Sequence, residues 1–299
     1  MSALSTIARH EVFALRRDRM PMMMLVIFSI MVALSGAIGF LTKNTVSNVW
    51  SAISAQGLTT AANPFADVSP LYFARNAIIY IVLIGTLMAI IAGVASALRE
   101  RKARTTDLIL TRPLSQQAFV FGKLAGICSW LVIVLGVMWG LASVMLTLIK
   151  GGLLTAGDYL ALGSMFLLAL PLLLGYAAIG LFFGFVSARE TSALVAPVSL
   201  WAFLTFVIPQ LGTAAQPISL LNPVPALATT GGVFDAIGPA MASIAVSERF
   251  KTAAGIALHD SNITGSVGAS ITTLVFFAIA AAAVLVTVRR DTIRGVFSE

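Results

Sequence analysis

The sequence predicts an all-α membrane protein with six transmembrane helices. Six largely apolar stretches run for 23 residues or more without a charged side chain, and only 10% of all residues are charged while 59% are hydrophobic. About 20 apolar residues are enough for a helix to cross a bilayer core of about 30 Å. The apolar runs are continuous rather than alternating, which favours helices over a transmembrane β-barrel. We expect residues 1–299 to form a single transmembrane domain.

The positions of the spans follow from these stretches and from the polar and helix-breaking residues between them. The expected spans are residues 22–41, 77–98, 124–149, 160–186, 192–211 and 270–288. The uncharged residues 44–66 are rich in Ser, Thr, Asn and Gln, so they predict a polar connection rather than a seventh span.

The longest uncharged stretch, which follows Glu190, has 44 residues and is too long for one span. Four prolines interrupt it, at positions 209, 217, 223 and 225. It therefore predicts one span followed by an external connection at residues 212–269. Within that connection, residues 218–233 either re-enter the membrane, buried by the protein itself, or belong to amphipathic helices on the external surface. Both alternatives are open.

Lysine and arginine residues predict the orientation. With six spans, 14 of them lie on the side of the two termini and 5 on the other side. Because basic loops stay cytoplasmic, both termini are expected inside the cell, with the protein in the plasma (cytoplasmic or inner) membrane. The basic residues lie at the ends of apolar stretches rather than in one basic domain, so the net charge of +7 does not indicate a nucleic-acid partner.

Residues 1–19, before the first span, predict an interfacial helix. Apolar residues recur at helical spacing on one side of it, whereas Arg9, Arg16 and Arg17 lie on the other. Such a helix lies flat at the cytoplasmic surface, with its basic side toward membrane lipids or a partner. Glu11 interrupts the apolar side. The alternative is a solvated basic tail that only fixes the topology.

The segment 99–123 is the largest cytoplasmic loop and predicts a short helix, a sharp turn and a second helix. It opens with a cluster of charged residues, and an apolar run follows. Arg112-Pro113 then ends the first helix, because proline disfavours helical geometry in the residue before it. Ser115 can cap a second helix, which begins near Gln116 and continues into the third span.

This loop resembles that of the permease subunits of type-2 ABC transporters. The residues that carry the resemblance are Glu100, Thr105-Thr106, the run Leu108-Ile109-Leu110-Thr111-Arg112-Pro113-Leu114-Ser115, and Gly122-Lys123. The six-span layout, the N-terminal helix and the long external connection also fit. One departure is Arg104-Thr105, where members of the family often have Gly-Thr.

The resemblance implies that the loop 99–123 is a coupling helix, seated in a cleft of a separate ATP-hydrolysing subunit. The residues expected at that interface are Glu100, Arg101, Arg104, Thr106, Leu108, Leu110, Arg112, Pro113, Leu114 and Ser115. Leucines would serve as apolar anchors and arginines would pair with acidic residues at the rim. The alternative is a basic loop held to anionic lipid headgroups.

Several motifs of enzymes and carriers are absent from the sequence. No phosphate-binding Gly-x-x-x-x-Gly-Lys-[Ser/Thr] pattern occurs, so this chain is expected to be no enzyme and to bind no cofactor, with ATP and Mg held by the partner subunit. The lone Cys128 and two distant histidines predict no disulfide and no metal site. No charged residue lies in the middle of a span, which argues against ion-coupled transport.

These observations predict the transmembrane subunit of an ATP-driven transporter, with export favoured by the family resemblance. Two permease copies, or this chain and a related permease, would line the path, and ABC ATPase subunits would drive it. The alternative is an ABC-type complex for metalloprotein maturation or signalling, similar to permeases for copper-site assembly in nitrous oxide reductase. A membrane enzyme or a purely structural scaffold are rivals of other classes. The apolar spans do not identify the substrate.

Three glycine pairs have the GxxxG spacing of close helix contacts. They are Gly122/Gly126, Gly136/Gly140 and Gly180/Gly184. With 24 glycines in the chain, some such pairs arise by chance, whereas others mark close packing between helices or a dimer surface.

Overall fold

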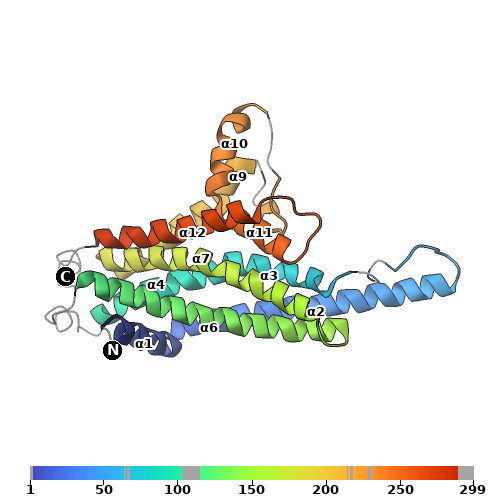
Figure 1. Ribbon diagram of the computed structural model, residues 1–299, viewed down its shortest axis with the longest axis horizontal. Coiled ribbons are helices and arrows are strands. Elements are labelled where there is room, and N and C mark those ends of the chain that lie inside the picture. The colour runs from blue at the N-terminus through green and yellow to red at the C-terminus, as the bar shows by residue number, and fades with distance from the viewer. Residues whose placement is uncertain are drawn as a thin grey trace.

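The computed structural model describes residues 3–63, 65, 68–102, 115–213, 215, 218–227 and 231–288. Six helical segments of this part are long and apolar enough to cross a membrane, which confirms the predicted all-α class with six spans. Figure 1 shows the long helices lying side by side along one axis. The N-terminal helix α1 (Ala3–Arg17) and the end of the last helix α12 (Val267–Val284) lie at the same end of this bundle.

The first span, α2 (Arg19–Ala55), is longer than the sequence predicted. Its 37 residues extend about 55 Å at 1.5 Å per residue, well beyond a bilayer core. Residues 44–55 of the expected polar connection continue this helix, and no separate seventh span lies in the described part of 44–66. No glycine or proline occurs between Lys43 and Gly57, so nothing interrupts the helix there. Gly57, just after the helix end, has a positive φ of 68°. Figure 1 shows this end of α2 projecting beyond the other helices.

The second span is the most enclosed helix of the bundle. It consists of η1 (Pro70–Ala74), α3 (Arg75–Tyr80), the π-helical η2 (Ile81–Gly85) and α4 (Thr86–Lys102). In its most apolar window 72% of the residues are buried inside the protein, compared with 22% in α2. The second span therefore lies at the centre, whereas most of α2 is left for lipid or another subunit.

The third and fourth spans are α6 (Gln116–Lys150) and α7 (Ala156–Val186). Gly151 ends α6 in the left-handed conformation, with a φ of 73° that glycine adopts without steric cost. A capping box starts α7, because the Thr155 hydroxyl accepts the Asp158 N–H at 3.2 Å and the Asp158 carboxylate accepts the Thr155 N–H at 2.9 Å.

The fifth span begins at Glu190, two residues before the predicted start at 192, and is not a regular α-helix. It runs through α8 (Glu190–Ala202), the π-helical η3 (Phe203–Val207) and α9 (Ile208–Thr213). Two hydrogen bonds connect it to the core: Trp201 Nε1 donates to Thr86 Oγ1 at 2.7 Å, and the hydroxyls of Tyr176 and Thr205 lie 3.2 Å apart.

The long connection between the fifth and sixth spans contains η4 (Ser219–Leu221), α10 (Val233–Ile244) and α11 (Val246–Ala257). Figure 1 shows α9 and α10 projecting from one side of the bundle, while α11 returns to it and packs on α7 and α12. Lys251 Nζ holds the chain before α10 by donating to Leu220 O at 2.6 Å. Whether residues 218–233 of this connection re-enter the membrane or lie on its external surface stays a prediction.

The sixth span is α12 with the short η5 (Leu285–Thr287). The helical segments contain the first five predicted spans, and the sixth ends one residue earlier than predicted, at Thr287.

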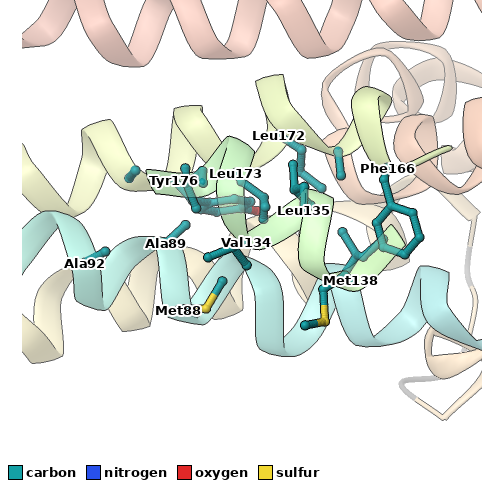
Figure 2. Close-up of a cluster of buried hydrophobic side chains, with 14 of the residues drawn as sticks. Met88, Ala89, Ala92, Val134, Leu135, Met138, Phe166, Leu172, Leu173 and Tyr176 are labelled. Carbon is teal, nitrogen blue, oxygen red and sulfur yellow. The ribbon is translucent and has the colours of Figure 1, made fainter. Parts of the chain in front are cut away.

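The core lies where α4, α6 and α7 meet. Figure 2 shows Met88, Ala89 and Ala92 from α4 facing Val134, Leu135 and Met138 from α6, with Leu172, Leu173 and Tyr176 of α7 beside them. All of these side chains are buried. The three helices therefore form one packed unit, and two of them carry the loop between the second and third spans.

Candidate coupling site

Most residues expected to contact an ATPase lie outside the described part of the chain. These are Arg104, Thr106, Leu108, Leu110, Arg112, Pro113 and Leu114. Glu100 and Arg101 belong to the last turn of α4, although only their backbone is described. Their role at an ATPase interface stays a prediction. The structure does describe the two helices that enter and leave the loop, and Ser115.

Ser115 caps the helix that leaves the loop. Its backbone is extended, with φ −69° and ψ 139°, and its hydroxyl accepts the Ala118 N–H at 3.2 Å. The side chain thus satisfies one of the amide groups that a helix start leaves without a partner. The predicted helix start near Gln116 is confirmed, and α6 continues from it into the third span without a break.

A buried cluster of charges joins the ends of these two helices to α1. The Glu11 carboxylate of α1, only 1% exposed, accepts a hydrogen bond from Lys123 Nζ of α6 at 3.0 Å. Its other oxygen accepts one from Arg99 Nη1 of α4 at 2.5 Å. Lys123, also 1% exposed, donates in addition to the carbonyl oxygen of Ser96 at 2.8 Å. Three helices therefore converge on a single carboxylate.

The electrostatics of the cluster keep Glu11 ionised. Burial alone would raise the pKa of this carboxyl, but the charges and hydrogen bonds of Lys123 and Arg99 outweigh that effect and lower its pKa from the ordinary value of 4.5. A buried charge costs several kcal/mol of desolvation unless it is paired and hydrogen-bonded, a condition that both partners of Glu11 fulfil. Separating the helices would leave the buried charges without partners, and the desolvation cost would then no longer be offset.

Asp18 extends the cluster to the first span. It lies between α1 and α2, where its Oδ1 accepts the Met20 N–H at 3.3 Å and caps α2. Its Oδ2 lies 3.6 Å from Arg99 Nη2, so Arg99 is placed between two carboxylates. The four side chains Glu11, Asp18, Arg99 and Lys123, here called the hub, carry two charges of each sign and connect α1, α2, α4 and α6.

Two glycines bring α1 against α6 closely enough to bury Glu11. A Cβ atom at Gly126 would lie 2.4 Å from Glu11 Cβ and 2.7 Å from Ala8 O, and one at Gly122 would lie 2.9 Å from Ile7 Cγ2. Only glycine fits at these positions without displacing α1. This GxxxG pair therefore marks a contact within the chain.

The other two GxxxG pairs differ from each other. Gly180 and Gly184 pack against α4, since a Cβ at Gly180 would lie 2.3 Å from Ile90 O. Gly136 and Gly140 have nothing within 4 Å of their Cβ positions in the described part of the chain. The spacing alone predicts none of these outcomes.

The basic side of α1 has the arrangement that its sequence predicted. Arg9, Arg16 and Arg17 are exposed, while Ile7 and Leu15 pack toward the bundle. Contact of these arginines with lipid headgroups or with a partner stays a prediction. Glu11 interrupts the apolar side because it is the residue that receives the two cations.

Sequence reasoning missed the hub. In the sequence, Lys123 stands out only as part of a Gly-Lys motif and Arg99 only as part of a charged cluster. The available signal was Glu11 itself, because a carboxylate on the apolar side of an amphipathic helix needs a buried cationic partner. The two partners lie 88 and 112 residues away along the chain.

A second set of buried charges stabilises the connection after the fifth span. Glu248 Oε1 accepts from Lys251 Nζ at 2.7 Å, and its Oε2 accepts the Ala226 N–H at 2.8 Å. Arg75 pairs with Asp260 at 2.8 Å and so ties the end of this connection to the second span. Among the described residues, no group of three or more His, Cys, Asp or Glu side chains could hold a metal ion.

Comparison with known proteins gives one match that covers nearly the whole chain. The family model described as ABC-2 family transporter protein matches residues 5–289. A comparison with curated proteins found no match. The matched residues include all six helical spans and the whole hub.

Proposed function

This chain belongs to the ABC-2 transporter family as a multi-pass permease component, and on that premise we propose that it forms, as a dimer, the path of an ATP-driven exporter. Separate ATPase subunits bind the loop 99–123 and hold the ATP and Mg. Both termini and this loop face the cytoplasm. The observation that carries the proposal is the hub, because it fixes both ends of the loop to the same N-terminal helix.

Because of the hub, a movement of the loop would be transmitted to the helices on both sides of it. The last residue of α4 is Lys102, and Ser115 caps the start of α6. Only 12 residues along the chain therefore separate the two helix ends. Glu11 binds the Arg99 and Lys123 side chains of these helices at once. A displacement of the loop by an ATPase therefore moves α1, α4 and α6 together.

The packing of α4 carries this displacement into the bundle. The backbones of α4 and α7 are in contact, since a Cβ atom at Gly93 of α4 would lie 2.2 Å from Ala177 O of α7. Trp201 of α8 also donates a hydrogen bond to Thr86, at the start of α4. Close contacts of this kind move as units because packed interfaces are stiff. The fourth and fifth spans would follow α4 and open the path.

The direct test is co-purification of the chain with its ATPase, together with the ATPase activity of the reconstituted complex. We expect the double variant Pro113→Ala and Leu114→Asp to lose most of the bound ATPase and its stimulation, because it would remove the turn that the sequence predicts and place a charge at the proposed interface. The matched control is Leu153→Asp, at an 80% exposed leucine in the connection between α6 and α7. It should keep both properties.

Two results would contradict the proposal. One is a stable, transport-competent complex that lacks any ATPase. The other is unchanged ATPase binding and stimulation in the Pro113 and Leu114 double variant while that variant folds and inserts as the parent does.

A further inference from the structure

A pocket lies within the connection between the fifth and sixth spans, where α9, α10 and α11 meet two loops. Its volume is about 310 Å³, which is within the range of small-molecule sites. The apolar part of its wall is formed by Pro209, Val224, Pro225, Ala242, Ala245 and Ile263. Glu248 and Arg249, from the first turns of α11, also line it. The pocket therefore combines an apolar wall with charged groups from one helix.

Arg249 is the only cation among the described residues that line this pocket. It is half-buried, and its Nε donates to Ala242 O at 3.0 Å, a bond that orients the guanidinium between α10 and α11. Its two terminal nitrogens make no hydrogen bond to another described residue. Because Nε is occupied, a ligand would meet the guanidinium end-on. The two terminal nitrogens can then donate two parallel hydrogen bonds to a carboxylate.

The carboxylate of Glu248 does not compete for Arg249, because both of its oxygens have other partners. One accepts from Lys251 Nζ at 2.7 Å, and the other accepts the Ala226 N–H at 2.8 Å. The side chain of Lys251 is only 1% exposed, so its charge stays beside Glu248. These two opposite charges compensate each other and leave the charge of Arg249 in excess at the pocket.

The remaining charges of the connection do not offset Arg249 either. Residues 212–269 contain five Asp, Glu, Lys and Arg residues, of which Asp235 and Asp260 are the other two. Asp260 pairs with Arg75 of α3 at 2.8 Å. Asp235 is exposed and accepts the Gly231 N–H at the start of α10, about 10 Å along that helix from the end that contributes to the pocket. The pocket is therefore suited to an anion.

We propose that this pocket binds a small monocarboxylate with an apolar body, either a free carboxylic acid or the C-terminus of a short peptide. Its carboxylate accepts from both terminal nitrogens of Arg249, and its apolar body lies against Val224, Pro225 and Ile263. One guanidinium matches one negative charge. A phosphate monoester carries nearly two charges at neutral pH, and the second would face the Glu248 carboxylate without a cation of its own.

The test is isothermal titration calorimetry of the full-length chain in nanodiscs, with the heats of empty nanodiscs subtracted. The probe is 4-phenylbutyrate, and 4-phenylbutylamine has a similar body with the opposite charge. We expect saturable binding of the carboxylate and none of the amine. Arg249→Gln should weaken binding of the carboxylate about tenfold, because it removes two charge-assisted hydrogen bonds. The control Lys150→Gln removes a cation that does not line the pocket and should leave the affinity unchanged.

A second pair of variants tests the pocket without touching the charge. Ala242→Phe fills the pocket from α10 and should abolish binding, whereas Ala240→Phe adds the same ring to an exposed position of that helix and should not. Ala226→Phe fills the pocket from the loop and replaces Ala242→Phe if that variant does not fold. Its backbone N–H can still donate to Glu248.

Three results would overturn the inference: no saturable binding below about 10 mM, equal binding of the amine, or full affinity in both Arg249→Gln and the pocket-filling variants. N-acetyl-alanyl-phenylalanine and its C-terminal amide distinguish the two sources of the carboxylate. Tighter binding of the peptide acid than of 4-phenylbutyrate identifies a peptide C-terminus, and weaker binding identifies a free acid. No ATPase takes part in the assay, so its outcome is independent of the proposed function.

Discussion

Glu11 is the residue through which α1 takes part in the bundle, because its carboxylate receives one cation from each helix that flanks the loop. Neither cation can leave without exposing a charge in an apolar setting. A basic helix that only rested on lipid headgroups would need no such residue. At this scale the N-terminal segment is a packed part of the bundle rather than a solvated tail.

The first prediction separates the charge from the shape of this contact. Glu11→Ala leaves Lys123 buried without its carboxylate, and we expect it to lower the free energy of unfolding by about 3–5 kcal/mol. The double variant Glu11→Met and Lys123→Met should regain most of this loss, because well-packed apolar side chains replace buried ion pairs at little cost. Thermal unfolding in detergent micelles measures both.

The matched control uses a pair that is not buried. Lys150 lies 3.9 Å from Asp158, and its side chain is 33% exposed. Surface pairs contribute about 0–1 kcal/mol, so Lys150→Met should change stability little. Equal losses in the Glu11 single variant and in the double variant would show that the packing of the residue, and not its charge, holds α1 in place.

At the scale of elements, the length of α2 and the two π-helical segments show what a uniformly apolar span conceals. Residues 44–55 are rich in Asn, Ser and Thr, yet they contain no glycine or proline to stop a helix, so α2 continues past the membrane boundary that composition predicts. The π-helical segments at Ile81–Gly85 and Phe203–Val207 leave no trace in the sequence. A π-helical turn contains one extra residue, which would shift the polar side of an amphipathic helix. A helix that is apolar on all sides has no polar side, so its sequence shows no such shift.

The proposed transmission of movement from the loop 99–123 depends on the contact between α1 and α6. Gly126→Leu would force side-chain atoms into the backbone of α1, because Ala8 O and Glu11 Cβ already lie 2.7 and 2.4 Å from the Cβ position. We expect α1 to detach, the hub to open and the ATPase stimulation to fall at least tenfold. Trypsin should then cleave after Arg16 and Arg17 much faster than in the parent.

Gly136→Leu is the control for this prediction. It places the same side chain on the same helix where nothing lies within 4 Å of the Cβ position in the described part of the chain. Its trypsin pattern should match that of the parent. If Gly126→Leu also keeps the parent pattern and its ATPase stimulation, α1 does not transmit the movement of the loop.

For the whole molecule, the solvent explains why the fold was predictable and the hub was not. Lipid requires every backbone group of a span to be satisfied within it, so length and hydropathy alone predict six helices. The pairing of Glu11 with Lys123 depends on which helices become neighbours, and one sequence does not contain that information. The expected ATPase contacts at Leu108, Leu110 and Arg112 lie outside the described residues and still rest on the motif.

The last prediction concerns the orientation of the whole bundle. With 14 of 19 basic residues on the side of the termini, that side should be cytoplasmic. In a Cys128→Ala background, which removes the only cysteine, single cysteines replace Arg17 in α1 and Leu153 in the connection after α6. Both positions are exposed. Helix α1 lies at one end of the bundle, and α6 runs from that end to the opposite one, where the connection with Leu153 follows it (Figure 1).

A maleimide that cannot cross the membrane should label Leu153→Cys on intact cells and Arg17→Cys only after permeabilisation. The reverse pattern would place the hub outside the cell, where no ATP-hydrolysing subunit could reach the loop 99–123. Because the charge count predicts the orientation independently of the hub, agreement between this labelling and the ATPase tests would support the proposed function from two separate observations. Energy would then enter at the end of the bundle where Glu11, Arg99 and Lys123 meet.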